Sequence, residues 1–172
     1  MLRTAIHLAL GLAAAAAAAA DGQLATLCRF INLSTGRDSP SIVYTAKCAR
    51  TVGGPLEVCS QLDLACCLTN HDGTLEAPVD MNTVNFADTC PGCHVDAAGV
   101  NMVCLCRQMN GTYGHASVDL SMKRNPWCQT TLIMGVDHII VVQDGTLACS
   151  TTIGKEVSEC PVTWIGPPRR RG

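Results

Sequence analysis

The hydrophobic residues of the chain occur in short runs that are rich in β-branched and aromatic types and are separated by turn signals. The run Ile42–Thr45 has the composition of a strand, and Asp-Gly pairs followed by Thr-Leu occur at Asp72-Gly73 and Asp144-Gly145. Such a pair between hydrophobic residues is typical of a tight hairpin turn. Residues 62–68 have the length of one or two helical turns, but no segment sustains a helical period with a cap at each end. The pattern predicts an all-β chain with short helical turns.

One order of motifs occurs twice along the chain, at about residues 28–76 and 89–148. Each copy has two spaced cysteines, then a segment with Asp-Leu, then an Asp-Gly-Thr-Leu turn. A solenoid needs at least three copies to bury a continuous core. Two copies are therefore expected to pair as pseudo-symmetric halves of one domain, residues 21–150, followed by a C-terminal tail, residues 151–172.

The second copy is longer than the first between the aspartate of its Asp-Leu segment and the glycine of its turn. Asp63 and Gly73 are ten positions apart, whereas Asp119 and Gly145 are 26 positions apart. The extra segment, about residues 122–137, has two interpretations that both stay open. It is either a surface loop stapled by a cysteine, Cys128, or an untranslated stretch retained in the gene model.

Residues 1–20 have the order of a secretory signal peptide. A positive residue, Arg3, precedes a short apolar stretch and an alanine run that ends before Asp21. The sequons Asn32-Leu33-Ser34 and Asn110-Gly111-Thr112 agree with export. Because the apolar stretch is too short to span a bilayer, the sequence predicts a secreted, extracellular protein without a membrane span.

Composition indicates a fold that depends on cross-links. Of 172 residues, 12 are cysteine and only 3% are aromatic, so disulfides are expected to stabilise a small core. The formal net charge is −2, and the basic residues cluster only at Arg169–Arg171. This charge pattern disfavours nucleic acid as a partner.

The segment Cys90-Pro91-Gly92-Cys93-His94 matches haem-attachment, zinc-binding and redox-dithiol patterns as well as a disulfide hairpin. Few aromatic residues are present to enclose a porphyrin, and the strand–helix–strand context of a redox dithiol is missing. We therefore predict structural disulfides here, with no metal and no cofactor.

The same segment predicts a hairpin in which residues 90–99 run outward and residues 102–107 return. Antiparallel geometry then pairs the outer cysteines, Cys90 with Cys106, and the inner cysteines, Cys93 with Cys104. A bond between Cys149 and Cys160 would close a short loop and pin the tail. The pairing of the remaining cysteines stays open: Cys59, Cys66, Cys67 and Cys128. One of the two adjacent cysteines, Cys66 or Cys67, is a candidate buried thiol.

At these residues the repeat resembles the cyanovirin-N homology family of lectins. The resemblance covers about Leu27 to Ser150, and it rests on the order and duplication of four motifs: Cys48-Ala49-Arg50-Thr51-Val52-Gly53-Gly54, Leu62-Asp63-Leu64 leading to Asn70-His71-Asp72-Gly73-Thr74-Leu75, Asn85-Phe86-Ala87-Asp88-Thr89-Cys90, and Asp144-Gly145-Thr146-Leu147. Secreted fungal members look similar. The resemblance implies an elongated, strand-exchanged pseudo-dimer with a mannose-type glycan site near each end. It also implies a disulfide between Cys28 and Cys48, and a monomer or a domain-swapped dimer.

A lectin site needs fixed amide, carboxylate and hydroxyl groups that match sugar hydroxyls. The resemblance places one such site at Asn70, His71, Asp72, Asn85, Asp88, Thr89 and Arg107. It places a weaker second site at Arg50, Thr51, Gln143 and Asp144. The second site is weaker for two reasons. Val142 replaces the family's asparagine, and Ala49 stands where the family can carry a glutamate. Val142→Asn would therefore restore an amide. Without the resemblance, Asn-x-Asp-Gly is also ordinary turn chemistry.

Catalysis has little support in the sequence. It contains no Gly-x-Ser-x-Gly elbow, no His-Glu-x-x-His and no glycine-rich phosphate loop. We therefore expect a protein that is not an enzyme but a secreted lectin, which binds high-mannose glycans without metal. The alternative is a disulfide-rich secreted interaction or effector protein that has lost sugar binding.

Overall fold

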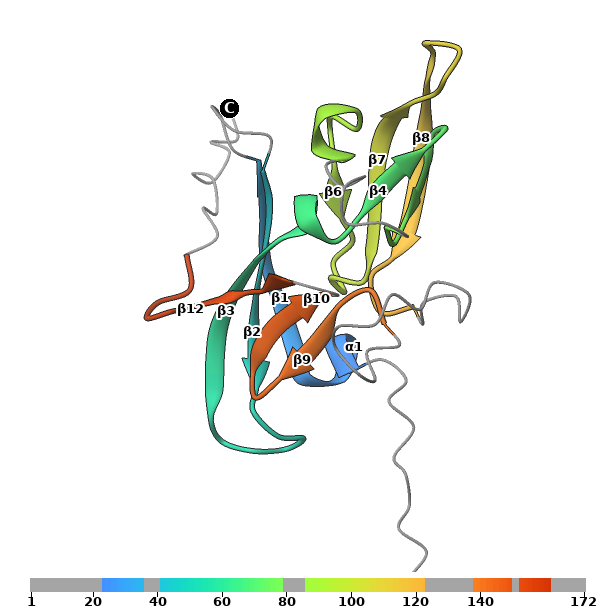
Figure 1. Ribbon diagram of the computed structural model, residues 1–172. Coiled ribbons are helices and arrows are strands. Elements are labelled where there is room, and N and C mark those ends of the chain that lie inside the picture. Colours follow the sequence, from blue (N-terminus) through green and yellow to red (C-terminus); the bar gives the residue numbers. More distant parts are fainter. Residues whose placement is uncertain (1–22, 36–40, 79–85, 123–137, 150–151, 162–172) are drawn as a thin grey trace, which may run out of the picture.

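The computed structural model describes residues 23–35, 41–78, 86–122, 138–149 and 152–161. Figure 1 shows two lobes of short strands, joined where the chain leaves β3 through a helical turn and enters β4. The elements of the described ranges are α1 (Gln23–Leu27), β1 (Cys28–Thr35), β2 (Ile42–Ala49), β3 (Glu57–Asp63), η1 (Leu64–Cys66), β4 (Thr69–His71), β5 (Thr74–Glu76), η3 (Phe86–Asp88), β6 (His94–Val95), β7 (Asn101–Arg107), β8 (Tyr113–Asp119), β9 (Val141–Gln143), β10 (Thr146–Cys149), β11 (Thr152–Ile153) and β12 (Lys155–Val157). The expected all-β architecture with short helical turns is confirmed.

The larger lobe contains a four-stranded antiparallel sheet in the order β1-β2-β3-β12. Alternate side chains of β2 are buried, including Ile42, Tyr44 and Ala46, which is why this β-branched and aromatic run folds as a strand. The edge strand β12 lies in the segment that the sequence assigns to a tail. It pairs with β3, with Val157 opposite Cys59.

The smaller lobe contains the three-stranded sheet β6-β7-β8 and the hairpin β4–β5. His94 of β6 lies opposite Val103 of β7, so the chain reverses where the sequence predicts a turn. In that turn the N–H of Gly99 donates to the carbonyl of Asp96 at 3.0 Å. The 90–107 hairpin therefore has the predicted register.

Each repeat contributes a hairpin to the lobe of the other repeat. The first repeat supplies β4–β5 to the smaller lobe, where Asn70 donates a hydrogen bond to Thr89. The second repeat supplies β9–β10 to the larger lobe, where the N–H of Leu147 donates to Ser60 Oγ at 3.0 Å. Figure 1 shows both hairpins beside the strands of the other half. The fold is thus the predicted strand-exchanged, pseudo-symmetric one.

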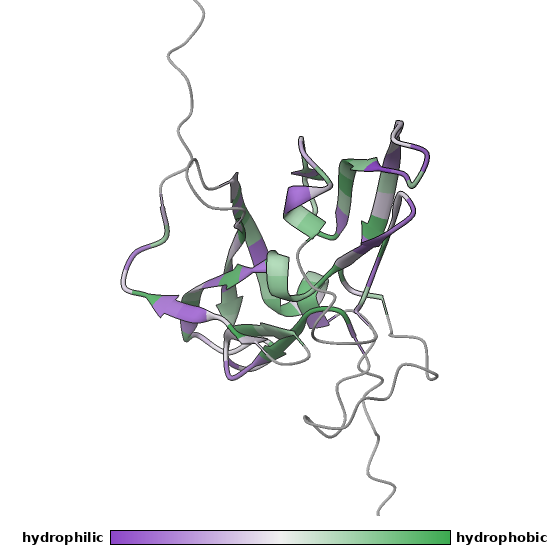
Figure 2. Cartoon of the chain, turned by 45° about the horizontal axis from the view of Figure 1, so that its top comes forward, coloured by the Kyte–Doolittle hydropathy of each residue, from purple (hydrophilic) through white to green (hydrophobic). Residues whose placement is uncertain are grey.

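One hydrophobic core runs through both lobes. Tyr44 from the larger lobe and Phe86 from the smaller one are each 1% exposed. The Tyr44 hydroxyl donates to the carbonyl of Gly99 at 2.8 Å, which ties the two repeats together inside this core. Burial raises the pKa of this hydroxyl above its ordinary value, so it stays a donor well beyond physiological pH. Figure 2 shows hydrophobic residues where the lobes meet and hydrophilic residues on the outer turns.

Three of the disulfides are those expected before the structure: Cys28–Cys48, Cys90–Cys106 and Cys93–Cys104. The first staples β1 to β2, and the other two staple the 90–107 hairpin. Cys90 and Cys93 are thus engaged in different disulfides, as the structural-disulfide interpretation of this segment predicts.

The predicted bond between Cys149 and Cys160 is wrong. Cys149 pairs with Cys67, and Cys160 pairs with Cys59. The reason is that β10 packs against the first repeat and that β12 lies along β3, which carries each cysteine to a distant partner instead of to its neighbour in sequence. Among the described residues Cys66 is the free thiol and is half-buried, whereas Cys128 lies outside them.

Candidate functional site

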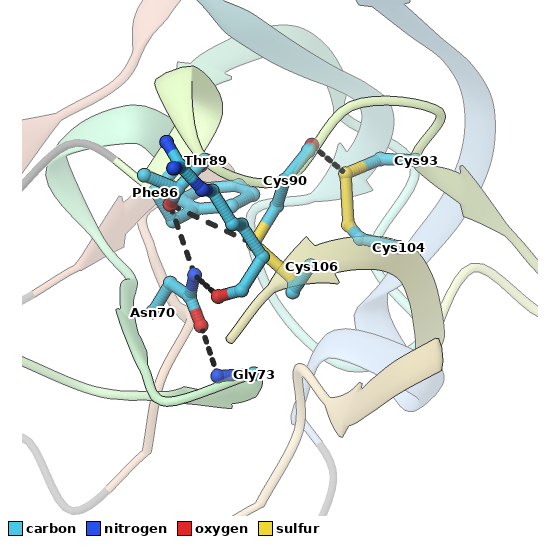
Figure 3. The surroundings of a disulfide bond; sticks show 9 residues. Asn70, Gly73, Phe86, Thr89, Cys90, Cys93, Cys104 and Cys106 are labelled. Atoms are coloured by element: carbon cyan, nitrogen blue, oxygen red, sulfur yellow. Dashed lines mark hydrogen bonds between the residues drawn. A yellow bond between two sulfur atoms is a disulfide. The ribbon is translucent and has the colours of Figure 1, made fainter. Parts of the chain in front are cut away.

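The side-chain amide of Asn70 fixes the β4–β5 turn on the end of β7. Its Nδ2 donates to Thr89 Oγ1 at 3.1 Å and to the carbonyl of Arg107 at 2.9 Å. Its Oδ1 accepts from the N–H of Gly73 at 2.8 Å. Figure 3 shows this amide between the turn and the disulfide-stapled hairpin. Since three hydrogen bonds already occupy the amide, Asn70 positions the site.

Asp72 has one carboxylate oxygen that is available to accept a hydrogen bond from a ligand. Its backbone is in the left-handed region, with φ 49°, which aspartate and asparagine tolerate better than other side chains. One oxygen, Oδ1, accepts from the N–H of Met109 at 2.8 Å. The side chain is exposed, and no described residue donates to Oδ2. The turn therefore presents a fixed acceptor to solvent.

Arg107 supplies a second hydrogen-bonding group at the end of β7, where the Asn70 amide contacts the main chain. Its backbone N–H donates to the carbonyl of Thr89 at 2.8 Å, and its carbonyl accepts from Asn70, so the main chain is held on both sides. The residue is exposed, and its guanidinium makes no hydrogen bond or ion pair with a described residue. We call Asn70, Asp72, Thr89 and Arg107 the Asn70 end.

The other residues proposed for this site have different surroundings. His71 is exposed, and its Nδ1 lies 3.2 Å from Oε1 of Glu76 on the facing strand β5. Asp88 is exposed in η3, directly before Thr89. Asn85 lies outside the described residues.

Sequence reasoning missed Gln108 and Met109, which follow Arg107 and hold the turn from the other side. A Cβ added to Gly73 would lie 2.7 Å from Gln108 Cγ, and Gly73 has φ +82°, so the turn requires glycine here. Their position directly after a candidate site residue was the signal that would have found them.

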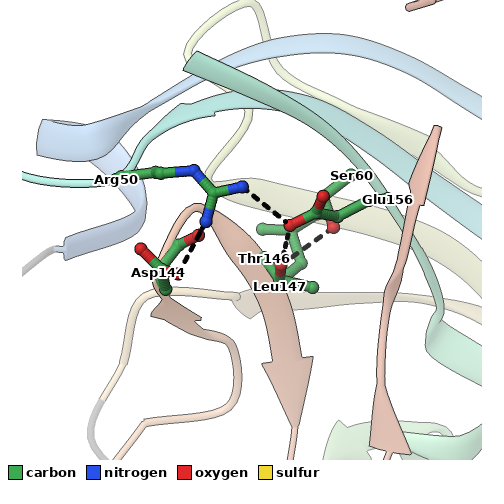
Figure 4. A network of polar contacts seen from close by, with 6 residues as sticks. All are labelled: Arg50, Ser60, Asp144, Thr146, Leu147 and Glu156. Atoms are coloured by element: carbon green, nitrogen blue, oxygen red, sulfur yellow. Dashed lines mark hydrogen bonds and ion pairs between the residues drawn. The ribbon is translucent and has the colours of Figure 1, made fainter. Parts of the chain in front are cut away.

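At the opposite end, the guanidinium of Arg50 is already paired. Nη1 lies 2.6 Å from Asp144 Oδ2 and 3.1 Å from the Asp144 carbonyl, and Nη2 lies 3.3 Å from Glu156 Oε1. Figure 4 shows this guanidinium between the two carboxylates. Thr51 and Gln143, the other residues proposed for this end, are exposed. We call Arg50, Thr51, Gln143 and Asp144 the Arg50 end.

Glu156 is a member of this network that the repeat does not contain. It comes from β12, and its Oε1 also accepts from the Thr146 hydroxyl at 3.1 Å. Sequence reasoning missed it because β12 follows the second repeat and has no counterpart after the first. A ligand that bound Arg50 would have to compete with two carboxylates of the protein itself.

A groove of about 680 Å³ lies beside the Arg50 end, lined in part by Lys47, Glu57 and Glu156. Lys47 Nζ is 2.6 Å from Glu57 Oε2, and this hydrogen bond and attraction lower the pKa of Glu57. Two of the cations that line the groove, Lys47 and Arg50, are thus paired with carboxylates of the protein itself.

The two ends also differ at the position of the bridging amide. Val142 occupies the place of Asn70, and Leu27, which precedes Cys28 as Thr89 precedes Cys90, occupies the place of Thr89. Val142 is 9% exposed and belongs to the hydrophobic core, and Leu27 is partly buried and packs against that core. An apolar pair therefore replaces the amide–hydroxyl hydrogen bond.

Burial of Val142 changes the result expected for Val142→Asn. An asparagine here has no hydroxyl at position 27 to bond, so we expect a loss of about 1 to 3 kcal/mol in the free energy of unfolding and no additional sugar site. Urea unfolding and the site number from titration calorimetry measure the two effects. An unchanged stability together with a second binding site would contradict this prediction.

Within the described ranges no three or more His, Cys, Asp or Glu side chains are grouped so as to hold a metal ion. None of the helices in those ranges has the length and apolar character needed to cross a membrane.

Residues 25–147 match the model of the CVNH domain. This match covers most of the chain, and the protein belongs to the CVNH family. Strand β11 and strand β12, the second of which carries Glu156, lie beyond the matched residues.

Several solved structures are similar to the chain. GzCVNH from Gibberella zeae is 20% identical, with 70% of this chain and 93% of that chain covered and a TM-score of 0.47. Microvirin, in its complex with mannobiose, is 24% identical, with 66% and 98% covered and a TM-score of 0.44. A MoCVNH3 variant in complex with (N-GlcNAc)4 is 13% identical, with 71% and 94% covered and a TM-score of 0.48. Among curated proteins, no sequence matches the chain.

Proposed function

We propose that this CVNH protein is a lectin that binds mannose-type glycans through the Asn70 end. The observation that carries the proposal is the rigid turn. Asn70 and the N–H of Met109 hold it on β7 while Asp72 Oδ2 and the Arg107 guanidinium stay uncommitted among the described residues. A site that is ordered before the ligand arrives loses little conformational entropy on binding.

The two uncommitted groups have complementary hydrogen-bonding roles. The Asp72 carboxylate accepts from sugar hydroxyls, and the Arg107 guanidinium donates to hydroxyl or ring oxygens. A sugar carries neighbouring hydroxyls that do both. Charged groups make stronger hydrogen bonds than neutral ones, so both residues are expected to contribute to the affinity for sugar.

The proposal includes the context in which the lectin works. Residues 1–20 are removed as a signal peptide, and residues 21–150 act outside the cell as a monomer or a domain-swapped dimer. High-mannose glycans are the proposed partners. No catalytic role is proposed.

Binding is expected to persist when divalent metal ions are removed, because the proposed contacts are direct hydrogen bonds from protein to sugar. Titration with a mannose oligosaccharide before and after addition of a chelator measures this, and a metal-dependent lectin is the positive control. A loss of binding that calcium or zinc restores would contradict the proposal.

A glycan array with the oxidised chain lacking residues 1–20 tests the function. The expected result is binding to mannose-terminated glycans, and arms with GlcNAc oligomers measure selectivity. Reduced, unfolded protein is the control for nonspecific adhesion. Binding to no glycan would refute the lectin proposal and favour an interaction protein that keeps the fold without sugar binding.

A further inference from the structure

The sequon Asn110-Gly111-Thr112 forms the tip of the hairpin between β7 and β8. The tip is a tight turn, in which the N–H of Gly111 donates to the carbonyl of Gln108 at 2.9 Å. The N–H of Gln108 in turn donates to the carbonyl of Thr112 at 2.8 Å. Asn110 and its two sequon partners are exposed. A bulky group on Asn110 therefore meets no packed layer of the fold.

The Asn110 side chain has one committed and one uncommitted polar atom. Its Oδ1 accepts from the N–H of Thr112 at 2.9 Å and from the Thr112 hydroxyl at 2.7 Å. No described residue accepts a hydrogen bond from its Nδ2. That nitrogen is the atom that an N-linked glycan occupies, so the native turn remains intact when a glycan is attached.

The same tip lies against the candidate sugar site. Met109, the residue before Asn110, donates its N–H to Asp72 Oδ1 at 2.8 Å. Gln108 is in close contact with Gly73 of the facing turn. A glycan on Asn110 thus begins one residue away from a direct contact to Asp72.

The other sequon has different surroundings. Asn32 is half-buried in β1, opposite Thr45 of β2, next to an irregularity in the strand register. It belongs to the larger lobe and not to the Asn70 end. Ser34→Ala removes this sequon without altering the Asn70 end, which makes it the matched control.

We infer that Asn110 is N-glycosylated and that the attached glycan covers the Asn70 end, so that it lowers the affinity for glycans in solution. The second half of this inference rests on the proposed lectin function. In the transfer, the bond between the anomeric carbon of a lipid-linked oligosaccharide and its diphosphate breaks. A bond from that carbon to Asn110 Nδ2 forms, the nitrogen loses one proton, and the lipid diphosphate leaves.

A tethered glycan competes strongly because it is always present beside the site. The effective concentration of a ligand on a short flexible tether is on the order of 1 mM. For a sugar that binds with a Kd of about 100 µM, such competition weakens the apparent affinity about tenfold. The attached glycan is itself mannose-rich, so it belongs to the ligand class proposed for the site.

The first part of the experiment measures the modification. The full chain is secreted from a eukaryotic host as wild type, Asn110→Gln and Ser34→Ala, and intact masses are compared before and after enzymatic removal of N-glycans. Wild type and Ser34→Ala are expected to lose the mass of an N-glycan that Asn110→Gln lacks. Absence of that difference would overturn the inference.

The second part measures binding of a mannose oligosaccharide by titration calorimetry. Glycosylated wild type is expected to bind at least about tenfold more weakly than Asn110→Gln from the same host. Wild type and Asn110→Gln from a host without N-glycosylation should bind equally. Equal affinities of the glycosylated and unglycosylated forms would overturn the inference that the glycan covers the Asn70 end. If no form binds, the lectin function and the covering both fail, while the mass difference still decides the modification.

Discussion

The double variant Asp72→Asn, Arg107→Gln is expected to lose about a hundredfold in affinity for mannose glycans. Each substitution removes one charged hydrogen-bonding group that the turn presents to solvent, and a hydrogen bond to a charged group contributes about 1.5 to 3 kcal/mol. Asparagine is the right replacement for Asp72, because it tolerates φ 49° and keeps an oxygen for the N–H of Met109. Titration calorimetry measures the affinity.

Two controls separate a binding effect from a folding effect. Both altered side chains are exposed, so the urea unfolding midpoint is expected to move little. The matched variant at the opposite end, Arg50→Gln with Asp144→Asn, should retain the affinity of the wild type. Retained binding in the first variant together with lost binding in the second would show that the Arg50 end is the sugar site.

Compared with removal of Cys93–Cys104, removal of the Cys67–Cys149 disulfide is expected to destabilise the fold more. This bond joins the two repeats across 82 positions, whereas Cys93–Cys104 spans 11. Cross-linking restricts the unfolded chain more when the closed loop is longer, with about 4 to 5 kcal/mol for the long loop and about 3 kcal/mol for the short one. Both Cys67 and Cys149 are also buried in the core where the lobes meet.

The two double variants Cys67→Ala, Cys149→Ala and Cys93→Ala, Cys104→Ala test this order. Urea unfolding of each oxidised protein gives its free energy of unfolding, and mass mapping confirms that the other bonds are unchanged. Equal losses, or a larger loss for the short loop, would show that native packing and not the length of the loop determines the contribution.

Local pairing made much of the fold predictable. The hairpin of residues 90–107 followed from its turn and its cysteine spacing, and the Asp-Gly turns followed from residue chemistry alone. The helix α1 was missed because its five residues are too short to show a period. It forms because Leu24 is buried against the core.

Long-range pairing was less predictable. Cys160 has a near neighbour in sequence, Cys149, but β12 carries it to Cys59, 101 positions away. Nothing in a three-residue, mostly polar segment such as Lys155–Val157 indicates which strand it will join. The charge network of Glu156 with Arg50 depends on the same unpredicted pairing.

The sequence predicted which residues lie together in the candidate site better than it predicted what each of them does. The duplicated motifs predicted that Asn70, Thr89 and Arg107 lie together, and in the structure they do. The sequence did not show that the Asn70 Nδ2 already donates two hydrogen bonds within the protein, because that depends on how the two repeats pack within the smaller lobe. This is why Asp72 and Arg107, and not Asn70, carry the mutational test.

The most direct test of the account is a titration of isotope-labelled protein with a mannose disaccharide, followed through the backbone amide resonances. If the sugar binds at the Asn70 end, the largest changes in amide chemical shift at saturation are expected at Asp72, Gly73 and residues 107–109. Shifts concentrated at residues 50–51 and 143–145, or no shifts at a saturating sugar concentration, would contradict it.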